Sequence, residues 1–250
     1  MVAEDIIAAL QLPEQARVNQ RVSKKLLIEN LAPTAVDRQQ IHEGIEEVQW
    51  IAALKPDNCG IPAYRDAQRE YVEVAVLHLT LRSSARPSRL IELLHRAVPH
   101  PTLLLISTPE SLQLSISHKR WAQNEADKTV LDGEVTAVTV SSTPQVTAAF
   151  LDAISLERQP RSDLSVFYQG WLDTLLALQV AQHTGSFRAA KSPLDAKARH
   201  QALQACAELE AQIVTLRAQA QKAQQIARQV ELNLQLKQLQ QALSEAQARL

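Results

Sequence analysis

The chain has 250 residues, of which 46% are hydrophobic and 21% are charged, and its 26 basic and 27 acidic residues give a net charge of -1. These values are typical of a folded domain, and they exclude a protein whose overall charge selects nucleic acid or an acidic membrane surface. The 5 glycines stand too far apart to form a phosphate-binding loop, which excludes the commonest nucleotide-binding motifs.

The start of the chain and its two cysteines bear on where in the cell the protein is expected. The first residues carry no basic region, and no later stretch approaches the roughly 18 to 20 apolar residues of a membrane span. Cys59 and Cys206 stand far apart and lack neighbouring metal ligands, as is usual in a reducing environment. We therefore expect a cytoplasmic protein with no membrane partner.

Helical spacing dominates the first 54 residues. It predicts a short apolar helix and two longer helices, over residues 5–10, 14–30 and 34–54. In the second of these, Val18, Val22 and Leu26 recur every four residues. Thr34 is placed to cap the third, with Asp37 three residues on. The sequence therefore predicts a helical N-terminal segment.

From residue 71 the apolar period changes from helical spacing to two. Alternation predicts strands over residues 71–82 and 112–117, and a continuous apolar run predicts a strand buried on both faces over residues 102–106. Residues 135–140 give one more strand. A helix over residues 86–98, which ends before Pro99 and Pro101, separates the first two strands. This order predicts an α/β (α+β) fold in which helices pack on a mixed β-sheet.

The remaining sequence is helical and divides at a linker. Thr143 or Ser142 begins a helix that reaches Ile154, and Ser162 or Asp163 begins another that reaches residue 183. The small and polar residues 184–193 follow as a linker. We expect a body over residues 1–183 and a tail over residues 194–250.

The tail contains no glycine, proline or aromatic residue, and it carries a heptad pattern. One apolar frame comprises Leu209, Ile213, Leu216, Ala220, Ala223, Ala227, Val230 and Leu234. A shifted frame comprises Leu232, Leu236, Leu239, Leu243, Ala246 and Leu250. A stutter in one coiled-coil helix about 80 Å long explains the shift, and the alternative is a tail that folds back on the protein's own helices.

This tail is expected to join proteins, by self-association or by contact with a partner's helix. The predicted interface residues are Leu209, Ile213, Leu216, Val230, Leu236, Leu239 and Leu243.

Catalytic motifs are not found in the sequence. No histidine stands in an HExxH pattern and no serine in GxSxG, so we expect no metal, cofactor or catalytic residue. The strand and helix order is compatible with a restriction-endonuclease core, which would use Glu73 and Lys119. A second carboxylate to share the metal ion is missing, so an active nuclease is the rival hypothesis and not the first.

One basic cluster stands out at the end of the strand over residues 112–117. His118, Lys119, Arg120 and Trp121 could hold a phosphate and stack a base, or contact an acidic protein surface. The alternative is a solvated strand end whose Trp121 covers the sheet.

Four segments of the sequence carry a resemblance to a known family. They read KKLLIENLAPTAVDRQQIHEGIEEVQWIAALKP, YVEVAVLHLTL, LIELLHRAVPHPTLLLIS and ISHKRW. Their order, the proline pair before the apolar strand, and Lys119 with Arg120 at a strand end resemble the bacterial domain of unknown function 4391 family. The resemblance covers roughly residues 24–178.

The resemblance implies a genomic neighbourhood, but it supplies no catalytic motif. Such proteins tend to be encoded beside helicases and DNA methyltransferases of restriction-like, phage-defence loci. The leading hypothesis is therefore a non-catalytic accessory subunit of an antiviral defence system that docks on a helicase or DNA methyltransferase and assembles through its tail. The alternatives are a divergent nuclease and a nucleic-acid-binding module that contacts DNA through the basic strand end, which the near-zero net charge disfavours.

Overall fold

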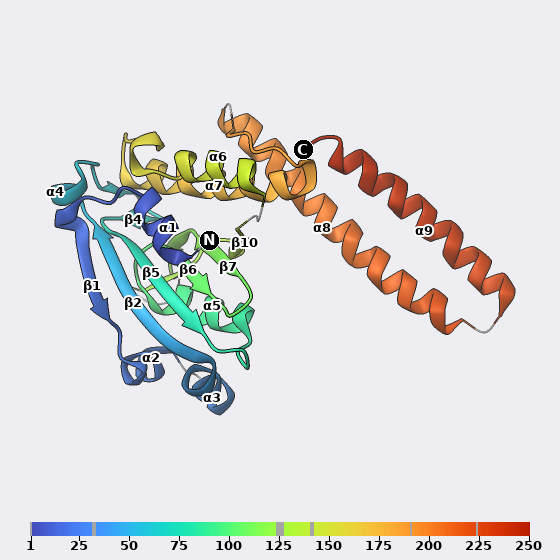
Figure 1. The fold of residues 1–250 in the computed structure, drawn as a ribbon, viewed down its shortest axis with the longest axis horizontal. Coiled ribbons are helices and arrows are strands. Elements are labelled where there is room, and N and C mark those ends of the chain that lie inside the picture. The colour runs from blue at the N-terminus through green and yellow to red at the C-terminus, as the bar shows by residue number, and fades with distance from the viewer. Residues whose placement is uncertain (1, 32–33, 124–127, 141–142, 191, 224) are drawn as a thin grey trace. The chain divides into compact units, whose positions relative to one another are not determined.

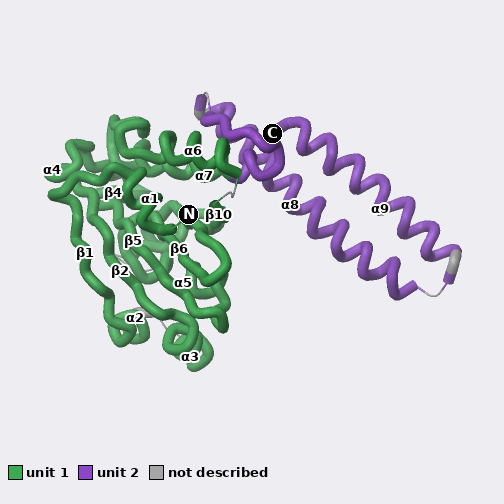
Figure 2. The backbone as a smooth tube through the Cα atoms, in the orientation of Figure 1, with its two compact units in different colours: residues 1–178 green, residues 179–250 purple. Residues whose placement is uncertain are grey.

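A computed structural model describes residues 2–31, 34–123, 128–140, 143–190, 192–223 and 225–250. The chain forms two compact units, Met1–Leu178 and Gln179–Leu250 (Figure 2). The division falls within a long helix, α7 (Leu164–Thr184), upstream of the linker that the sequence predicts.

The first unit combines a mixed sheet with short helices (Figure 1). Its other helices among the described residues are α1 (Ala3–Ala9), η1 (Glu14–Ala16), α2 (Lys24–Leu31), α3 (Ala35–Gly44), α4 (Pro56–Cys59), α5 (Pro87–Ala97), α6 (Pro144–Ala153) and η2 (Leu156–Arg158). Its strands are β1 (Arg17–Arg21), β2 (Ile45–Leu54), β3 (Tyr64–Arg65), β4 (Glu70–Tyr71), β5 (Val74–Leu81), β6 (Thr102–Ser107), β7 (Leu112–Ser117), β8 (Lys119–Trp121), β9 (Thr129–Leu131) and β10 (Thr136–Thr139). The predicted mixed α/β fold is confirmed.

Six strands form the main sheet, in the order β1-β2-β5-β6-β7-β10. Only β5 and β6 run parallel among these paired strands, and α5 is the crossover helix between them. The first residues of β5 and β6 and the last residues of β2 and β7 therefore meet at one end of the sheet. This sheet end carries the polar side chains described below.

An apolar core lies between one face of the sheet and helices α2, α3 and α5. It includes Leu27 of α2, Ile41 of α3, Leu90 and Leu94 of α5, and Leu79 of β5, all buried. Burial of such side chains supplies most of the stabilisation of the body.

Helices α6 and α7 pack through a second set of large side chains. Phe150 of α6 and Trp171 of α7 are fully buried. The indole Nε1 of Trp171 donates a hydrogen bond to the carbonyl of Ile154 at 2.9 Å. The N–H of Leu156 donates to the carbonyl of Leu10, which ties the α6–α7 connection to the end of α1.

The predicted helix over residues 14–30 is wrong in its first part, where the structure has η1 and β1. The N–H of Val22 donates to the carbonyl of Val48 at 2.8 Å, and β1 pairs with the edge of β2. Asn19 has φ 48°, a left-handed conformation that interrupts an α-helix and that asparagine tolerates better than most residues. Pairing with β2 outweighs the helical spacing here.

The predicted helix over residues 34–54 ends early, at Gly44, and β2 follows. Thr34 does cap α3, because its Oγ1 accepts a hydrogen bond from the N–H of Asp37. The register of β2 on β5 shifts between Ile45 and Glu47, so Ile45 and Val48 both face the apolar core although they are three residues apart. A β-bulge therefore produced spacing that is typical of a helix.

The second unit contains two long helices, α8 (Pro193–Lys222) and α9 (Ile226–Gln247), which pack side by side as a hairpin (Figure 1). The prediction of one continuous helix is therefore wrong, and the alternative of a tail that folds back is confirmed. The first apolar frame begins on α8 and continues onto α9 with Ala227, Val230 and Leu234, whereas Leu232 to Ala246 of the shifted frame lie on α9 alone.

Candidate functional site

The predicted basic cluster lies at the sheet end, on a small second sheet. β8 follows β7 after one residue, His118, and pairs with β9. The N–H of Trp121 donates to the carbonyl of Gln68 at 2.7 Å, which joins β8 to the segment before β4. The four predicted residues are close in the fold, but their side chains have different surroundings.

Lys119 points into the protein, contrary to the expectation that it reaches out to an anion. Its side chain is 2% exposed, and its Nζ donates to the carbonyl of His95 at 2.6 Å and to the carbonyl of Val98. These carbonyls belong to the C-terminal end of α5, where helices lack intrahelical donors and carry partial negative charge. Burial lowers the pKa of Lys119 from 10.5 to about 7.

Arg120 and Trp121 retain access to solvent. Both are half-buried, and the Arg120 side chain is 39% exposed. Its Nε lies 3.8 Å from Asp132 Oδ1, and Asp132 also pairs with Arg69 at 2.5 Å. Because this carboxylate faces two guanidinium groups, contact of Arg120 with an anionic partner stays a prediction.

His118 belongs to a chain of hydrogen bonds within the body. Its Nε2 lies 2.8 Å from Oε1 of Gln169, and its Nδ1 bonds the hydroxyl of Tyr71. The amide oxygen of Gln169 accepts, so the imidazole carries its hydrogen on Nε2 and Tyr71 donates to Nδ1. Burial lowers the pKa of His118 and raises that of Tyr71 to about 12, which keeps both groups neutral.

Tyr168 of α7 closes the sheet end from within. Its hydroxyl donates toward the carbonyls of Thr102 at 2.8 Å and Ser117 at 2.9 Å, and it accepts from the N–H groups of the same two residues. The ring is fully buried and contacts the rings of Tyr71 and His118. This tyrosine fixes the start of β6 to the end of β7.

Glu73 and His100 lie at the same sheet end. The sequence pairs Glu73 with Lys119 only as nuclease candidates, and it does not single out His100. Glu73 is 7% exposed, and its Oε2 lies 3.3 Å from Nζ of Lys55. Its Oε1 has no hydrogen-bond partner among the described residues. Burial lowers the pKa of His100, while Glu73 raises it and Lys119 lowers it. No local sequence signal predicts this cluster, because its members come from separate strands.

Among the described residues, the sheet end has one buried carboxylate, that of Glu73. A metal-dependent nuclease site uses several carboxylates to bind its metal ions. Across the described ranges of the chain, no group of three or more His, Cys, Asp or Glu side chains could hold a metal ion.

In that same part of the chain, no helix is both long and apolar enough to span a membrane.

Two serine–histidine contacts are the closest approach to a nucleophile and base. His78 Nε2 lies 2.8 Å from Oγ of Ser107, and His95 Nε2 lies 2.9 Å from Oγ of Ser115. His95 is 1% exposed, and burial lowers its pKa to about 3. His95 and Ser115 therefore join α5 to β7 and are closed to a substrate.

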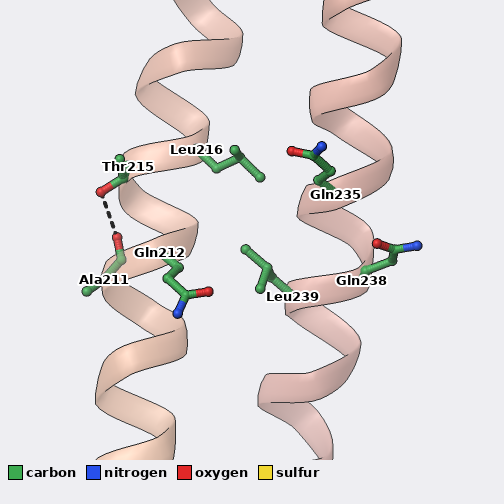
Figure 3. Close-up of a pocket in the computed structure, with 7 residues that line it drawn as sticks. All are labelled: Ala211, Gln212, Thr215, Leu216, Gln235, Gln238 and Leu239. Atoms are coloured by element: carbon green, nitrogen blue, oxygen red, sulfur yellow. Dashed lines mark hydrogen bonds between the residues drawn. The ribbon is translucent and has the colours of Figure 1, made fainter.

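The hairpin of the second unit carries an open groove of about 570 Å³ between its helices (Figure 3). In this groove Leu216 and Leu239 extend toward one another from facing helices, and both are half-buried. The lining residues are Ala211, Gln212, Thr215, Leu216, Gln235, Gln238 and Leu239. The two leucines form an apolar floor under a polar rim.

The residues of the predicted tail interface differ in burial within the hairpin. Ile213 is buried, and Leu209, Leu236 and Leu243 are half-buried like the two groove leucines. Val230 is 58% exposed, and a contact of these residues with another chain stays a prediction. Leu232, which was not among the predicted interface residues, is 2% exposed.

Comparison with known proteins places the chain in a family. A family model described as a domain of unknown function (DUF4391) matches residues 10–243, a longer span than the resemblance in the sequence covers. No curated protein and no solved structure matches the chain. The family match includes both the sheet-end residues and most of the hairpin, and the chain therefore belongs to the DUF4391 family.

Proposed function

We propose that this protein is a non-catalytic accessory subunit of a bacterial antiviral, restriction-like defence system. Its body docks on a helicase or DNA methyltransferase, and its helical hairpin is the assembly element. The defence-system role rests on the family resemblance. The docking role of the body and the assembly role of the hairpin rest on the side chains that each unit exposes.

The exposed apolar surface of the hairpin is the observation that carries the assembly role. Val214, Val230 and Leu234 are 66%, 58% and 61% exposed, and the groove leaves Leu216 and Leu239 half-buried. Isolated apolar side chains are common on surfaces, but Val230 and Leu234 belong to a heptad frame, which is typical of helices that pair with other helices.

The chemistry of the sheet end supports a non-catalytic body. Lys119 and His118 are engaged by protein groups, and His95 is closed to solvent. Half-buried Arg120 and Trp121 then offer a small surface for an acidic patch of the partner. Arginine and tryptophan are enriched in the centres of protein interfaces.

Co-expression with a helicase or a DNA methyltransferase of a restriction-like locus tests the docking role. The tagged full chain is expected to retain the partner at 150 mM salt, and the Arg120→Ala variant with Trp121→Ala is expected to retain at least about tenfold less, a loss typical of interface anchor residues. The matched control is Arg158→Ala, an exposed arginine on η2 that pairs only with Asp152 among the described residues. Failure of the wild-type chain to bind either partner contradicts the proposal.

A divergent nuclease is the second candidate, because Glu73 and Lys119 both lie within electrostatic reach of His100. Single- and double-stranded DNA and RNA with Mg²⁺ or Mn²⁺ are the substrates that test it. We expect no cleavage above that of a Glu73→Gln variant purified in parallel. Cleavage by the wild-type chain that Glu73→Gln abolishes would replace the accessory function with an enzymatic one.

A further inference from the structure

Two arginines from separate segments of the body converge on one carboxylate. Arg69 stands directly before β4, Arg120 lies on β8, and Asp132 directly follows β9. Nη2 of Arg69 lies 2.5 Å from Oδ2 of Asp132, and Nε of Arg120 lies 3.8 Å from Oδ1. Each oxygen of the carboxylate therefore faces a different guanidinium group. Arginine side chains bind carboxylate ligands through contacts to both oxygens in this way.

Backbone hydrogen bonds hold the two arginines near each other without help from Asp132. The N–H of Trp121 donates to the carbonyl of Gln68 at 2.7 Å, which fixes β8 beside the segment that carries Arg69. The N–H of Asp66 donates to the carbonyl of Arg69 at 2.9 Å and closes a turn there. Displacement of Asp132 therefore leaves the site in place, and an incoming anion would relieve the repulsion between the two guanidinium groups.

Asp132 satisfies this site incompletely. Its distance of 3.8 Å from Nε of Arg120 is too long for a hydrogen bond. Among the described residues, the Arg120 guanidinium makes one hydrogen bond, from Nη1 to the carbonyl of Trp121 at 3.3 Å. The side chains of Arg69, Arg120 and Asp132 are 40%, 39% and 24% exposed. Ion pairs with this much exposure contribute little to stability, so displacement of Asp132 costs little.

The charges around the site favour a protein carboxylate over a nucleic acid as the ligand. Arg65, the nearby cation on β3, already pairs with Glu70, and Lys119 is turned inward. A phosphate backbone is bound by several uncompensated cations along its path. Arg69 and Arg120 instead allow the exchange of one carboxylate for another.

We propose that Arg69 and Arg120 bind a carboxylate on an acidic segment of the partner protein, and that Asp132 occupies this site as an internal competitor until the partner docks. Docking then exchanges the Asp132 carboxylate for that of the partner. This inference rests on the proposed docking function and adds Arg69 and Asp132 to the docking surface. It predicts that removal of one charged residue from this surface strengthens binding.

The test is fluorescence anisotropy of a labelled oligoglutamate peptide with the full chain at low salt. Asp132→Asn nearly preserves the shape of the side chain and removes its charge. We expect this variant to bind the peptide about two- to fivefold more tightly than the wild type, because an exposed ion pair no longer competes. The matched control is Asp152→Asn, which makes the same change in net charge at an exposed pair with Arg158, and it should bind like the wild type.

The arginine variants test the other half of the site. In the Asp132→Asn background, Arg69→Ala and Arg120→Ala are each expected to weaken peptide binding by about tenfold or more, because charge-assisted hydrogen bonds are lost. Arg158→Ala is the control and should leave binding unchanged. Circular dichroism checks that each variant is folded. The gain expected from Asp132→Asn cannot arise from misfolding, so it remains a test even where an arginine variant unfolds.

Three outcomes overturn the inference. The first is that Asp132→Asn binds the peptide no more tightly than the wild type, and the second is that Asp152→Asn gains as much. The third is that oligothymidylate of equal charge binds more tightly than oligoglutamate, which would assign the two arginines to a nucleic acid.

Recovery of the co-expressed partner separates this inference from the docking function. A wild-type chain that retains the helicase or methyltransferase, with no gain from Asp132→Asn in peptide binding, refutes the exchange and leaves docking in place. A wild-type chain that retains neither partner refutes docking itself.

Discussion

The C-terminal end of α5 determines where the Lys119 side chain lies. The last carbonyls of α5 have no intrahelical donors, and the Lys119 ammonium supplies donors to two of them. Burial of an ammonium group is unfavourable in itself, as the lowered pKa of Lys119 indicates. The balance favours lysine because its absence would leave buried carbonyls without donors.

We expect Lys119→Met to lower the free energy of unfolding by about 1–3 kcal/mol, because the carbonyls of His95 and Val98 lose their shared donor. Arg120→Ala, at the next position, should change it by less than about 1 kcal/mol, since its ion pair is partly exposed. Urea unfolding followed by circular dichroism measures both. Equal effects of the two variants contradict the structural role of Lys119.

The pH dependence of stability should carry the signature of Lys119. Its pKa is about 7 in the folded chain and 10.5 when unperturbed, so the unfolded state binds more protons between these values. The stability of the wild type should therefore rise with pH from about 7 toward 10.5, relative to Lys119→Met, and be independent of this group below pH 7. Parallel urea titrations from pH 6 to 10 measure the difference, and a flat difference contradicts the lowered pKa.

Gly170 of α7 lies close to Gln159 and Pro160 of the segment after η2. A Cβ at this position would lie 2.6 Å from Oε1 of Gln159 and 2.7 Å from Cδ of Pro160. Gln159 cannot retreat freely, because its Nε2 donates to the carbonyls of Ala153 and Ser155. The gap between α7 and the segment after η2 is therefore closed to any larger residue.

Gly170→Ala is expected to destabilise the protein by about 1–3 kcal/mol, although alanine has the better helix propensity. Val166→Ala, at an exposed position of the same helix, is the matched control and should change stability little. Thermal unfolding monitored by circular dichroism measures both. A higher midpoint for Gly170→Ala would mean that propensity outweighs the steric contact.

Among the secondary-structure elements, α8 and α9 depend most on each other. Each has one apolar stripe, and a single helix of this composition is marginal in water without a partner for that stripe. Leu232 begins the α9 stripe and is 2% exposed, whereas Val214 on α8 is 66% exposed. The seam, and not the exposed valine, should hold the hairpin together.

Leu232→Ala should increase amide hydrogen exchange along both helices by about tenfold or more, as expected when a buried leucine is truncated. Val214→Ala should leave exchange nearly unchanged. Mass spectrometry at low micromolar protein concentration, where intermolecular pairing is least favoured, measures this. An equal effect of the two variants would show that the helices do not depend on the seam.

For the whole molecule, the division into two compact units has a direct consequence. The first unit ends at Leu178, and α7 ends at Thr184. A chain that stops after Ser192 keeps both intact and removes α8 and α9 entirely. The body should then fold without the hairpin.

We expect the 1–192 chain to unfold cooperatively at nearly the same midpoint as the body of the full chain, and to lose self-association in light scattering. Calorimetry and light scattering measure these two quantities. An unchanged oligomer after truncation contradicts the assembly role of the hairpin, and an unfolded 1–192 chain contradicts the independence of the body.

The sequence predicted well those elements whose apolar pattern is local. The strands β5, β6, β7 and β10 and the helix α5 lie close to their predicted ranges, and the mixed α/β fold follows from their order. It failed at β2, where the bulge between Ile45 and Glu47 imitates helical spacing. It also failed at β1, whose hydrogen bonds come from a strand far along the chain.

The site residues divide in the same manner. His118, Lys119, Arg120 and Trp121 could be selected as a basic cluster because they are adjacent in sequence, and the heptad pattern of the tail is equally local. Only the tertiary structure places Lys119 under the end of α5, joins Glu73, Lys55 and His100 at one sheet end, and packs α8 against α9. The physical reason is that composition and period record which face of an element is apolar, whereas the partner that covers the face is chosen by contacts between segments distant in sequence.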